Sequence, residues 1–219
     1  DLNFFPQIEI GQMKQSPPTE FFILACLIAG VLTGTAQATE LKRVSIEEPT
    51  FRRPVAIQRL DENTAVVANQ SGTLSVVDLM KWAVVSEFRI GGSPSDLAVS
   101  NGRLLVTDSD RSRLLVLQLD RESARVVSEV AVPESPVTVR SSRDGTSCSV
   151  ASLWARTLTI VSLPEESKTQ ATIVASVDLP FAPREQIRND ASSQIIVADS
   201  FSGRLAVVST ESRKIEAVH

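Results

Sequence analysis

The sequence predicts an all-β protein, a β-propeller of four-stranded antiparallel blades. Three observations predict it: a repeated unit, strand-and-turn chemistry inside each unit, and no helical periodicity after residue 40. The repeat begins at Pro54, Pro94, Pro136 and Pro183, so the successive intervals are 40, 42 and 47 residues. Self-similarity at a period of roughly 40–50 residues is typical of blade arrays, in which each unit is one small sheet.

The second strand of each unit is rich in Val, Ile, Leu or Ala and ends in Asn, Asp or Ser. The four examples are residues 65–69, 104–108, 148–152 and 195–199. A polar turn follows, and the third strand then opens on Leu74, Leu114, Leu158 and Leu205, at gaps of 5, 6, 6 and 6 residues. Short β-branched runs bounded by turn residues are the signature of antiparallel strands.

A Pro-led strand opens each unit, and a more polar strand closes it. The leading proline suits the innermost strand, where its missing N–H is not needed for pairing. The closing strands are predicted at 83–90, 124–132, 171–179 and from 214 to 218. Alternation of apolar and polar residues over 84–90 is typical of a half-exposed outer strand. The units therefore lie near 51–92, 93–134, 135–181 and 182–219.

These units resemble the YVTN-type β-propeller repeat. The matching segments are Val67-Ala68-Asn69, Thr73 to Asp78 (Thr-Leu-Ser-Val-Val-Asp) and Gly91-Gly92-Ser93-Pro94. The resemblance covers about residues 51–219, although the chain contains no Tyr and keeps the Asn only once. It implies the propeller fold and says little about function.

The blade count leaves two alternatives open. Three complete units and a fourth that stops at His219 are present, whereas propellers resembling this repeat usually have seven blades. We expect a chain that is incomplete at its C-terminus, and a self-standing four-bladed ring is the alternative. Residues 41–47 are predicted to form an outer strand that completes either the fourth blade or a further one.

The N-terminus is interpreted as a secretory signal peptide. Residues 21–32 form an uncharged apolar run, preceded by Met13-Lys14 and followed by the small-x-small pattern Ala36-Gln37-Ala38. The run is too short to span a bilayer, which takes about 20 residues. We expect cleavage after Ala38, with residues 13–38 as the signal, 1–12 as an upstream extension and 39–219 as the propeller. A secreted or periplasmic location follows, with no membrane span after signal removal.

The two cysteines have separate interpretations. Cys26 lies in a lipobox-like run, but the apolar stretch continues past it, which favours an ordinary signal peptide over a lipid anchor. Cys148 lies on a predicted inner strand and is interpreted as a buried structural thiol. Trp82 and Phe88, near the first outer strand, are interpreted as packing residues.

The amino-acid composition argues against several classes of binding and catalytic site. The net charge of −4 arises from 22 basic and 26 acidic residues, which gives no general attraction to nucleic acid. The only histidine is His219, so no His-dependent triad, zinc cluster or covalent haem motif is formed. We therefore predict no catalytic residue, no metal site and no cofactor in these residues.

Polar residues at the turns are the candidate binding residues. Asp108 and Asp110 are interpreted either as oxygen ligands at one mouth of the propeller or as turn residues. Arg111, Arg156 and Arg204 fall in the same turn of successive units, where they form either an anion-binding rim or a solvated turn. Trp154 is interpreted as a contact anchor or as a cap on the neighbouring blade.

Three functions remain open. The first is a non-enzymatic secreted or periplasmic scaffold that binds a protein or glycan partner in the cell envelope through one face. The alternative is the propeller portion of a larger envelope enzyme, a cytochrome c-fused oxidoreductase or lactonase-like hydrolase, with its active site beyond His219. The third is an adhesive surface repeat protein.

Overall fold

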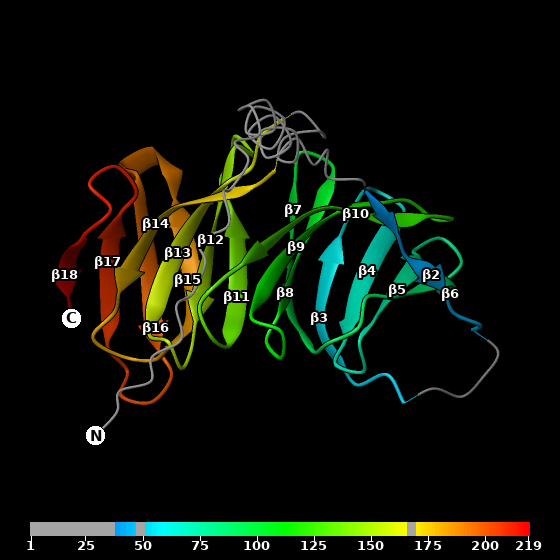
Figure 1. The fold of residues 1–219 in the computed structure, drawn as a ribbon, viewed down its shortest axis with the longest axis horizontal. Helices are drawn as coiled ribbons and strands as arrows, with labels where there is room; N and C mark the ends of the chain where they lie inside the picture. The colour runs from blue at the N-terminus through cyan, green and yellow to red at the C-terminus, as the bar shows by residue number, and fades with distance from the viewer. Residues whose placement is uncertain (1–37, 47–50, 166–169) are drawn as a thin grey trace, which may run out of the picture. The chain divides into compact units, whose positions relative to one another are not determined.

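Four antiparallel sheets follow one another along the chain, each built on four consecutive strands, and the first two each gain a short fifth strand from the N-terminal segment (Figure 1). The structure, a computed structural model, describes residues 38–46, 51–165 and 170–219. The first sheet contains β3 (Pro54–Arg59), β4 (Thr64–Asn69), β5 (Thr73–Asp78) and β6 (Ala83–Arg89). The second contains β7 (Pro94–Ser100), β8 (Arg103–Asp108), β9 (Arg113–Leu119) and β10 (Ala124–Ala131). The third contains β11 (Pro136–Ser141), β12 (Ser147–Ser152), β13 (Thr157–Ser162) and β14 (Thr172–Asp178). The fourth contains β15 (Pro183–Asn189), β16 (Gln194–Asp199), β17 (Leu205–Ser209) and β18 (Ile215–Val218), with a 3-10 turn at Asp190–Ser192.

The same irregularity recurs at the start of every sheet. The pairing of the first two strands shifts register directly after the leading proline, between Pro54 and Ala56 and at the three equivalent positions. A bulge of this kind increases the local twist of a strand. The innermost strands are therefore shaped alike in all four sheets, which allows one mode of sheet packing to repeat.

The sheets pack face to face in chain order, and their innermost strands β3, β7, β11 and β15 are successive neighbours (Figure 1). We call the face turned toward the next sheet the forward face, and the one turned toward the previous sheet the rear face. Leu74, Leu114 and Leu158 lie on three forward faces and are fully buried, each in an apolar cluster shared with the next sheet. Burying one such leucine side chain contributes roughly 1.5–3 kcal/mol.

Polar contacts also join neighbouring sheets. Gln186 of β15 is 2% exposed and lies against the third sheet, where an apolar residue stands in the equivalent position of the other units. Its amide oxygen accepts a hydrogen bond from Ser149 Oγ at 2.6 Å, and its amide nitrogen donates to Thr138 Oγ1 at 3.1 Å. Because a buried amide is costly unless its hydrogen bonds are made, these contacts favour one relative position of the two sheets.

The N-terminal strand takes a different place from the one expected. β1 (Thr39–Glu40) pairs with β10 of the second sheet, and β2 (Lys42–Arg43) pairs with β6 of the first. Leu41 lies between them, donates its N–H to Ala124 O at 2.7 Å and packs on the apolar residues shared by the two sheets. The expectation that this segment completes the fourth or a further blade is therefore wrong. This segment instead pairs with the outer strands β10 and β6 of the first two sheets.

The all-β propeller class and its four-stranded antiparallel blades are confirmed. Cys148 is fully buried, and burial raises the pKa of its thiol to about 12, so it stays protonated and unreactive at neutral pH.

Phe88 is a packing residue, but Trp82 is 83% exposed in the turn between β5 and β6. Asp78 accepts the N–H groups of two residues in that turn, which fixes a tight conformation with Trp82 at the surface.

We expect Leu158→Ala to lower the free energy of unfolding by about 2–5 kcal/mol, because it leaves a cavity between the third and fourth sheets. Urea denaturation followed by circular dichroism measures the change. Met80→Ala is the control, since Met80 is 75% exposed in a turn and should lose less than about 0.5 kcal/mol. Equal losses in the two variants would contradict face-to-face packing at Leu158.

Candidate binding site at the turn ends of the third and fourth sheets

In the second and fourth sheets the second strand ends in an aspartate whose carboxylate holds the following turn. Asp108, fully buried, accepts hydrogen bonds from the N–H groups of Ser93 at 2.9 Å and Arg111 at 3.3 Å. The Arg113 guanidinium donates to the same carboxylate at 2.9 Å. A Cβ at Gly92, where φ is +66°, would lie 2.0 Å from Asp108 Oδ2, so only glycine fits there. Both carboxylate oxygens of Asp108 therefore already accept hydrogen bonds from residues in and beside the turn.

Asp199 has the equivalent position in the fourth sheet and a similar role. Its carboxylate accepts the N–H of Phe201 at 3.0 Å, the hydroxyl of Ser202 and Nε of Arg204 at 3.1 Å. These contacts, the Ser202 hydroxyl above all, hold the pKa of Asp199 below its usual value. The charge of Arg204 is therefore balanced within its own turn.

Two aromatic side chains project from neighbouring turns and stack on each other. Trp154 lies two positions after Ser152, and Phe201 lies two positions after Asp199, so they are equivalent residues of successive repeats. Their ring centroids are 6.5 Å apart and the ring planes meet at 22°. Trp154 remains 61% exposed and Phe201 74% exposed. The pair thus spans two sheets and still offers most of its surface to a partner.

A shallow hollow of about 170 Å³ lies beneath this pair. Phe181 is buried in it, and the Arg204 guanidinium lies over the Phe181 ring at 5.2 Å from its centre. Arg156, exposed and at a φ of +52°, stands at its rim and makes no ion pair with any residue of the described ranges. The hollow is lined by Trp154, Arg156, Pro180, Phe181, Ala182, Asp199, Phe201, Ser202 and Arg204.

The structure brings together half of the residues that the sequence nominated. Trp154, Arg156 and Arg204 line one hollow, and Trp154 both stacks on the neighbouring sheet and remains exposed. The other three belong to the β8–β9 turn of the second sheet. Asp108 is buried in its turn, whereas Asp110 and Arg111 are exposed there and take no part in this hollow. Whether any of the six binds a ligand stays a prediction.

Two residues of the hollow were missed by sequence reasoning. Phe201 has a clear signal, since alignment of the repeats places it on Trp154, and two aromatic residues in equivalent turns predict a shared patch. Phe181 has a weaker one, because it precedes the fourth leading proline in a connecting segment. Its role depends on the packing of that segment between two sheets, which the sequence does not reveal.

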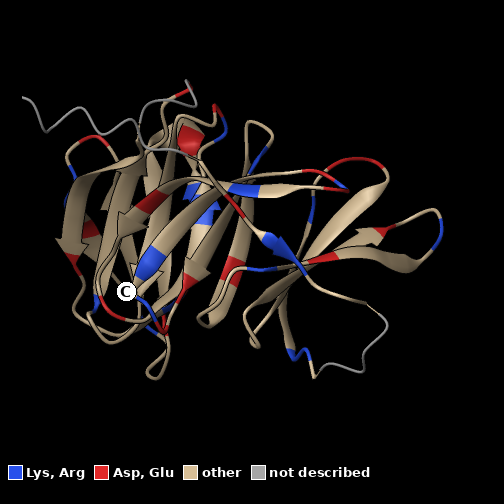
Figure 2. Ribbon diagram, turned by 45° about the vertical axis from the view of Figure 1, so that its right-hand side comes forward, with Lys and Arg blue, Asp and Glu red and all other residues tan. Residues whose placement is uncertain are grey.

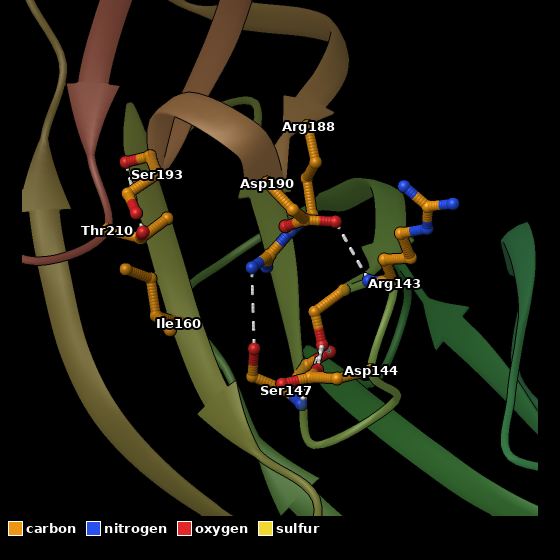
Figure 3. A pocket seen from close by; sticks show the side chains of 9 residues that line it. Arg143, Asp144, Ser147, Ile160, Arg188, Asp190, Ser193 and Thr210 are labelled. Atoms are coloured by element: carbon orange, nitrogen blue, oxygen red, sulfur yellow. Dashed lines mark hydrogen bonds and ion pairs between the residues drawn. The ribbon is translucent and has the colours of Figure 1, made fainter.

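A larger hollow of about 500 Å³ lies at the opposite end of the same two sheets (Figure 3). Arg188, mostly buried, points into it and donates to Asp190 at 3.3 Å and to Ser147 at 3.4 Å. Asp190 in turn accepts the N–H of Arg143 at 2.8 Å (Figure 3). These contacts connect the turns of the third and fourth sheets, while Nη1 of Arg188 is buried without a hydrogen-bond partner among the described residues. We interpret this end as a structural clamp.

Asp144, beside that clamp, has a strongly lowered pKa. The Ser142 hydroxyl donates to its carboxylate, as do the N–H and hydroxyl groups of Thr146, and together they lower the pKa to about 2. Hydrogen bonds to the charged form of a carboxylate have this effect. Asp144 therefore stabilises its turn only while it is ionised.

Charged side chains of both signs are spread over the sheets and turns (Figure 2). Among the described residues, no group of three or more His, Cys, Asp and Glu side chains is placed to hold a metal ion. The same part of the chain contains no helix long and apolar enough to cross a membrane. The predicted signal peptide lies almost wholly outside the described residues.

Stacked four-stranded sheets with equivalent turns at one end define a β-propeller repeat protein. The model of the NHL repeat matches residues 92–117, which include β7, β8 and most of β9. No curated protein sequence matches this chain.

Solved structures with the same fold support this class. Hydrazine synthase of Kuenenia stuttgartiensis is 19% identical, with a TM-score of 0.67 over 87% of this chain and 52% of that one. A functionally unknown protein from Desulfotomaculum acetoxidans DSM 771 is 17% identical, with a TM-score of 0.65 over 76% of this chain and 57% of the other. The β-propeller domain of Cps50 (Swd1) from Myceliophteria thermophila is 12% identical, with a TM-score of 0.61 over 84% and 58%. The chain spans about half the length of these proteins, and identities this low show the fold alone.

We expect Asp108→Ala to lower the free energy of unfolding by about 3–5 kcal/mol, because it leaves Arg113 and two N–H groups without their buried partner. Chemical denaturation measures this change. Asp110→Ala, in the same turn but exposed, is the matched control and should stay within about 0.5 kcal/mol of the parent. A loss below about 1 kcal/mol at Asp108 would show that its carboxylate is not needed to hold the turn.

We expect Asp144→Asn to destabilise the protein at neutral pH and to do so less as pH falls from about 4 to about 2. The pKa of Asp144 is about 2 in the folded protein, below the ordinary aspartate value of 3.8. The ionised carboxylate therefore contributes its full stabilisation above pH 3.8, and this contribution is lost as the pH falls to about 2. Urea midpoints of parent and variant at pH 7, 4, 3 and 2 measure the difference. Thr146→Val, which removes one donor, should show a smaller effect over the same pH range. A pH-independent difference would contradict this account.

Proposed function

We propose that this chain is a secreted or periplasmic propeller scaffold that binds a protein partner through the hollow beneath Trp154 and Phe201. The single observation behind the proposal is the stacked, largely exposed aromatic pair that spans two sheets. Large exposed aromatic side chains are costly in water, and such patches mark interaction sites in soluble domains. Because the pair comes from equivalent turns, the repeat itself provides the rigid support of the site.

The residue types of the hollow fit a protein-binding site. Tryptophan and arginine dominate the binding energy of protein interfaces, especially where they surround a small pocket. Trp154 and Phe201 offer aromatic surface, and Phe181 closes the floor. Arg204 is already balanced by Asp199, so Arg156 is the cation at the rim that remains to pair with a partner.

The partner that fits is a polypeptide segment with an apolar or aromatic side chain next to a carboxylate. The apolar side chain would contact the Trp154–Phe201 pair, and the carboxylate would reach the guanidinium of Arg156, which can bind it in a two-pronged manner. A glycan is the alternative ligand, because sugar rings also stack on exposed aromatic residues.

The location and the repeat type are proposals that rest on sequence. A secreted or periplasmic location follows from the apolar run and the Ala36-Gln37-Ala38 pattern. The YVTN type rests on segments such as 67–69, while the NHL match supports a propeller repeat more generally.

A larger enzyme is the second candidate function. Its support is the likeness to hydrazine synthase, of which this chain covers 52%. In that case the chain would be the propeller portion of a cytochrome c-fused oxidoreductase or a lactonase-like hydrolase. The propeller would position an active site formed by other residues. The aromatic hollow would then serve contact between domains.

The test is retention of envelope and secreted proteins of the source organism on the immobilised chain, with each retained protein identified by mass spectrometry and its affinity measured. We expect Trp154→Ala and Arg156→Ala each to weaken binding of the same protein by about 10-fold or more, as interface hot spots do. Trp82→Ala is the matched control, because Trp82 is a still more exposed tryptophan (83% against 61% for Trp154) but lies in a turn of the first sheet. It should bind normally.

Three outcomes would contradict the proposal. Equal binding by all variants would exclude the hollow as the contact surface. Loss of binding with Trp82→Ala alone would place the site at the other end of the sheets. Retention of a glycan in place of a protein would contradict the proposed partner.

A further inference from the structure

One arginine is buried between the third and fourth sheets with its hydrogen bonds incomplete. The side chain of Arg188 is 8% exposed, and its guanidinium points into the hollow of about 500 Å³ at that end (Figure 3). Nε donates to Asp190 at 3.3 Å and Nη2 donates to Ser147 at 3.4 Å, while Nη1 has no partner among the described residues. Hydrogen bonds between a guanidinium and a carboxylate are usually about 2.7–2.9 Å long. The guanidinium is therefore held by long contacts and is short of acceptors.

Sheet packing does not require an arginine at this position. Its equivalents in the first three sheets are Arg59, Val99 and Ser141, each at the same register of the innermost strand. Val99 packs on the apolar cluster of the first two sheets, and Ser141 is half-buried. Arg59 is exposed and donates to two carbonyl groups of its own turn. Because a buried charge is costly unless its hydrogen bonds are made, Arg188 indicates a role other than packing.

The carboxylates around the hollow already have hydrogen-bond donors. One oxygen of Asp190 accepts from Arg188, and the other accepts the N–H of Arg143 at 2.8 Å. Both oxygens of Asp144 accept hydrogen bonds from within its own turn. The guanidinium of Arg143, exposed at the rim, makes no ion pair with any residue that the structure describes. The hollow thus has donors left over, and the missing group is a negatively charged acceptor.

We propose that this hollow binds a small organic molecule through a carboxylate or phosphate group, with the Arg188 guanidinium as its anchor. A guanidinium binds either oxyanion in a two-pronged manner. The oxyanion would accept from Nη1 and would replace Ser147 as the acceptor of Nη2. The volume of about 500 Å³ lies within the range of roughly 300–1,000 Å³ that is usual for small-molecule sites, and Ile160 contributes an apolar wall.

The site is formed wholly by strands and turns of the third and fourth sheets. It lies at the end opposite the hollow beneath Trp154 and Phe201. An oxyanion here would strengthen the contact between the two sheets, because it would bind the fourth sheet through Arg188 beside the third-sheet turn that carries Arg143. The proposal is therefore independent of the partner proposed for the aromatic hollow.

The test is a titration of the full chain with inorganic phosphate, and separately with acetate, followed by the amide signals in ¹H–¹⁵N NMR spectra. Sodium chloride keeps the ionic strength constant. We expect at least one of the two ions to give saturable shifts, confined to residues 142–147 and 188–193. The ion that binds more tightly identifies the oxyanion group. A lack of saturable shifts with both ions, or saturable shifts elsewhere alone, would overturn the proposal.

Two variants show whether Arg188 is the anchor. Arg188→Gln should raise the dissociation constant of the ion by at least about 10-fold, because it removes the charged donors. Arg59→Gln is the matched control, since it changes the equivalent but exposed arginine of the first sheet, and it should bind as the parent does. A folded Arg188→Gln chain with the parent affinity would contradict the assignment. If circular dichroism shows that Arg188→Gln is unfolded, the location of the shifts in the parent decides.

Discussion

The whole fold depends on one constraint: a small β-sheet with two apolar faces must have both faces covered. No single unit of this chain meets that constraint, since the forward leucines Leu74, Leu114 and Leu158 are buried only by the next sheet. Cohesion is therefore spread over the contacts between sheets and is not concentrated in one central core. The shared bulge after each leading proline keeps the sheets similar enough for the same contact to be made three times.

Turn residues divide their roles by position. The residue that ends the second strand points inward and holds the turn, as Asp108 and Asp199 do with backbone N–H groups and an arginine. The residue two positions later lies at the surface, as Trp154 and Phe201 do. Where an aspartate holds the turn, as Asp199 does beside Phe201, the exposed side chain keeps its direction and loses little entropy on binding. A repeated turn can therefore change its surface chemistry without loss of its conformation.

Polar contacts set the relative position of sheets that apolar packing alone would leave adjustable. Gln186 replaces an apolar residue on the rear face of the fourth sheet, and its bonds to Ser149 and Thr138 suit only one alignment. At one end, Arg188 donates to Ser147 and Asp190 accepts the N–H of Arg143, which connects the same two sheets. The third and fourth sheets are thus held in the middle and at one end, and the aromatic hollow spans them at the opposite end.

The sequence alone determined the fold class, the strands and their order, because a period of 40–47 residues and the strand-and-turn pattern are local properties of the chain. It also nominated Trp154, Arg156 and Arg204, since equivalent turns of stacked repeats lie at the same end. Only the tertiary structure decided that Phe181 and Phe201 join them, that Asp108 is buried in its turn and that Trp82 is exposed. It also placed residues 39–43 on the first two sheets. These outcomes depend on which surfaces meet between sheets, and that is a property of pairs of segments far apart in the chain, which no local pattern records.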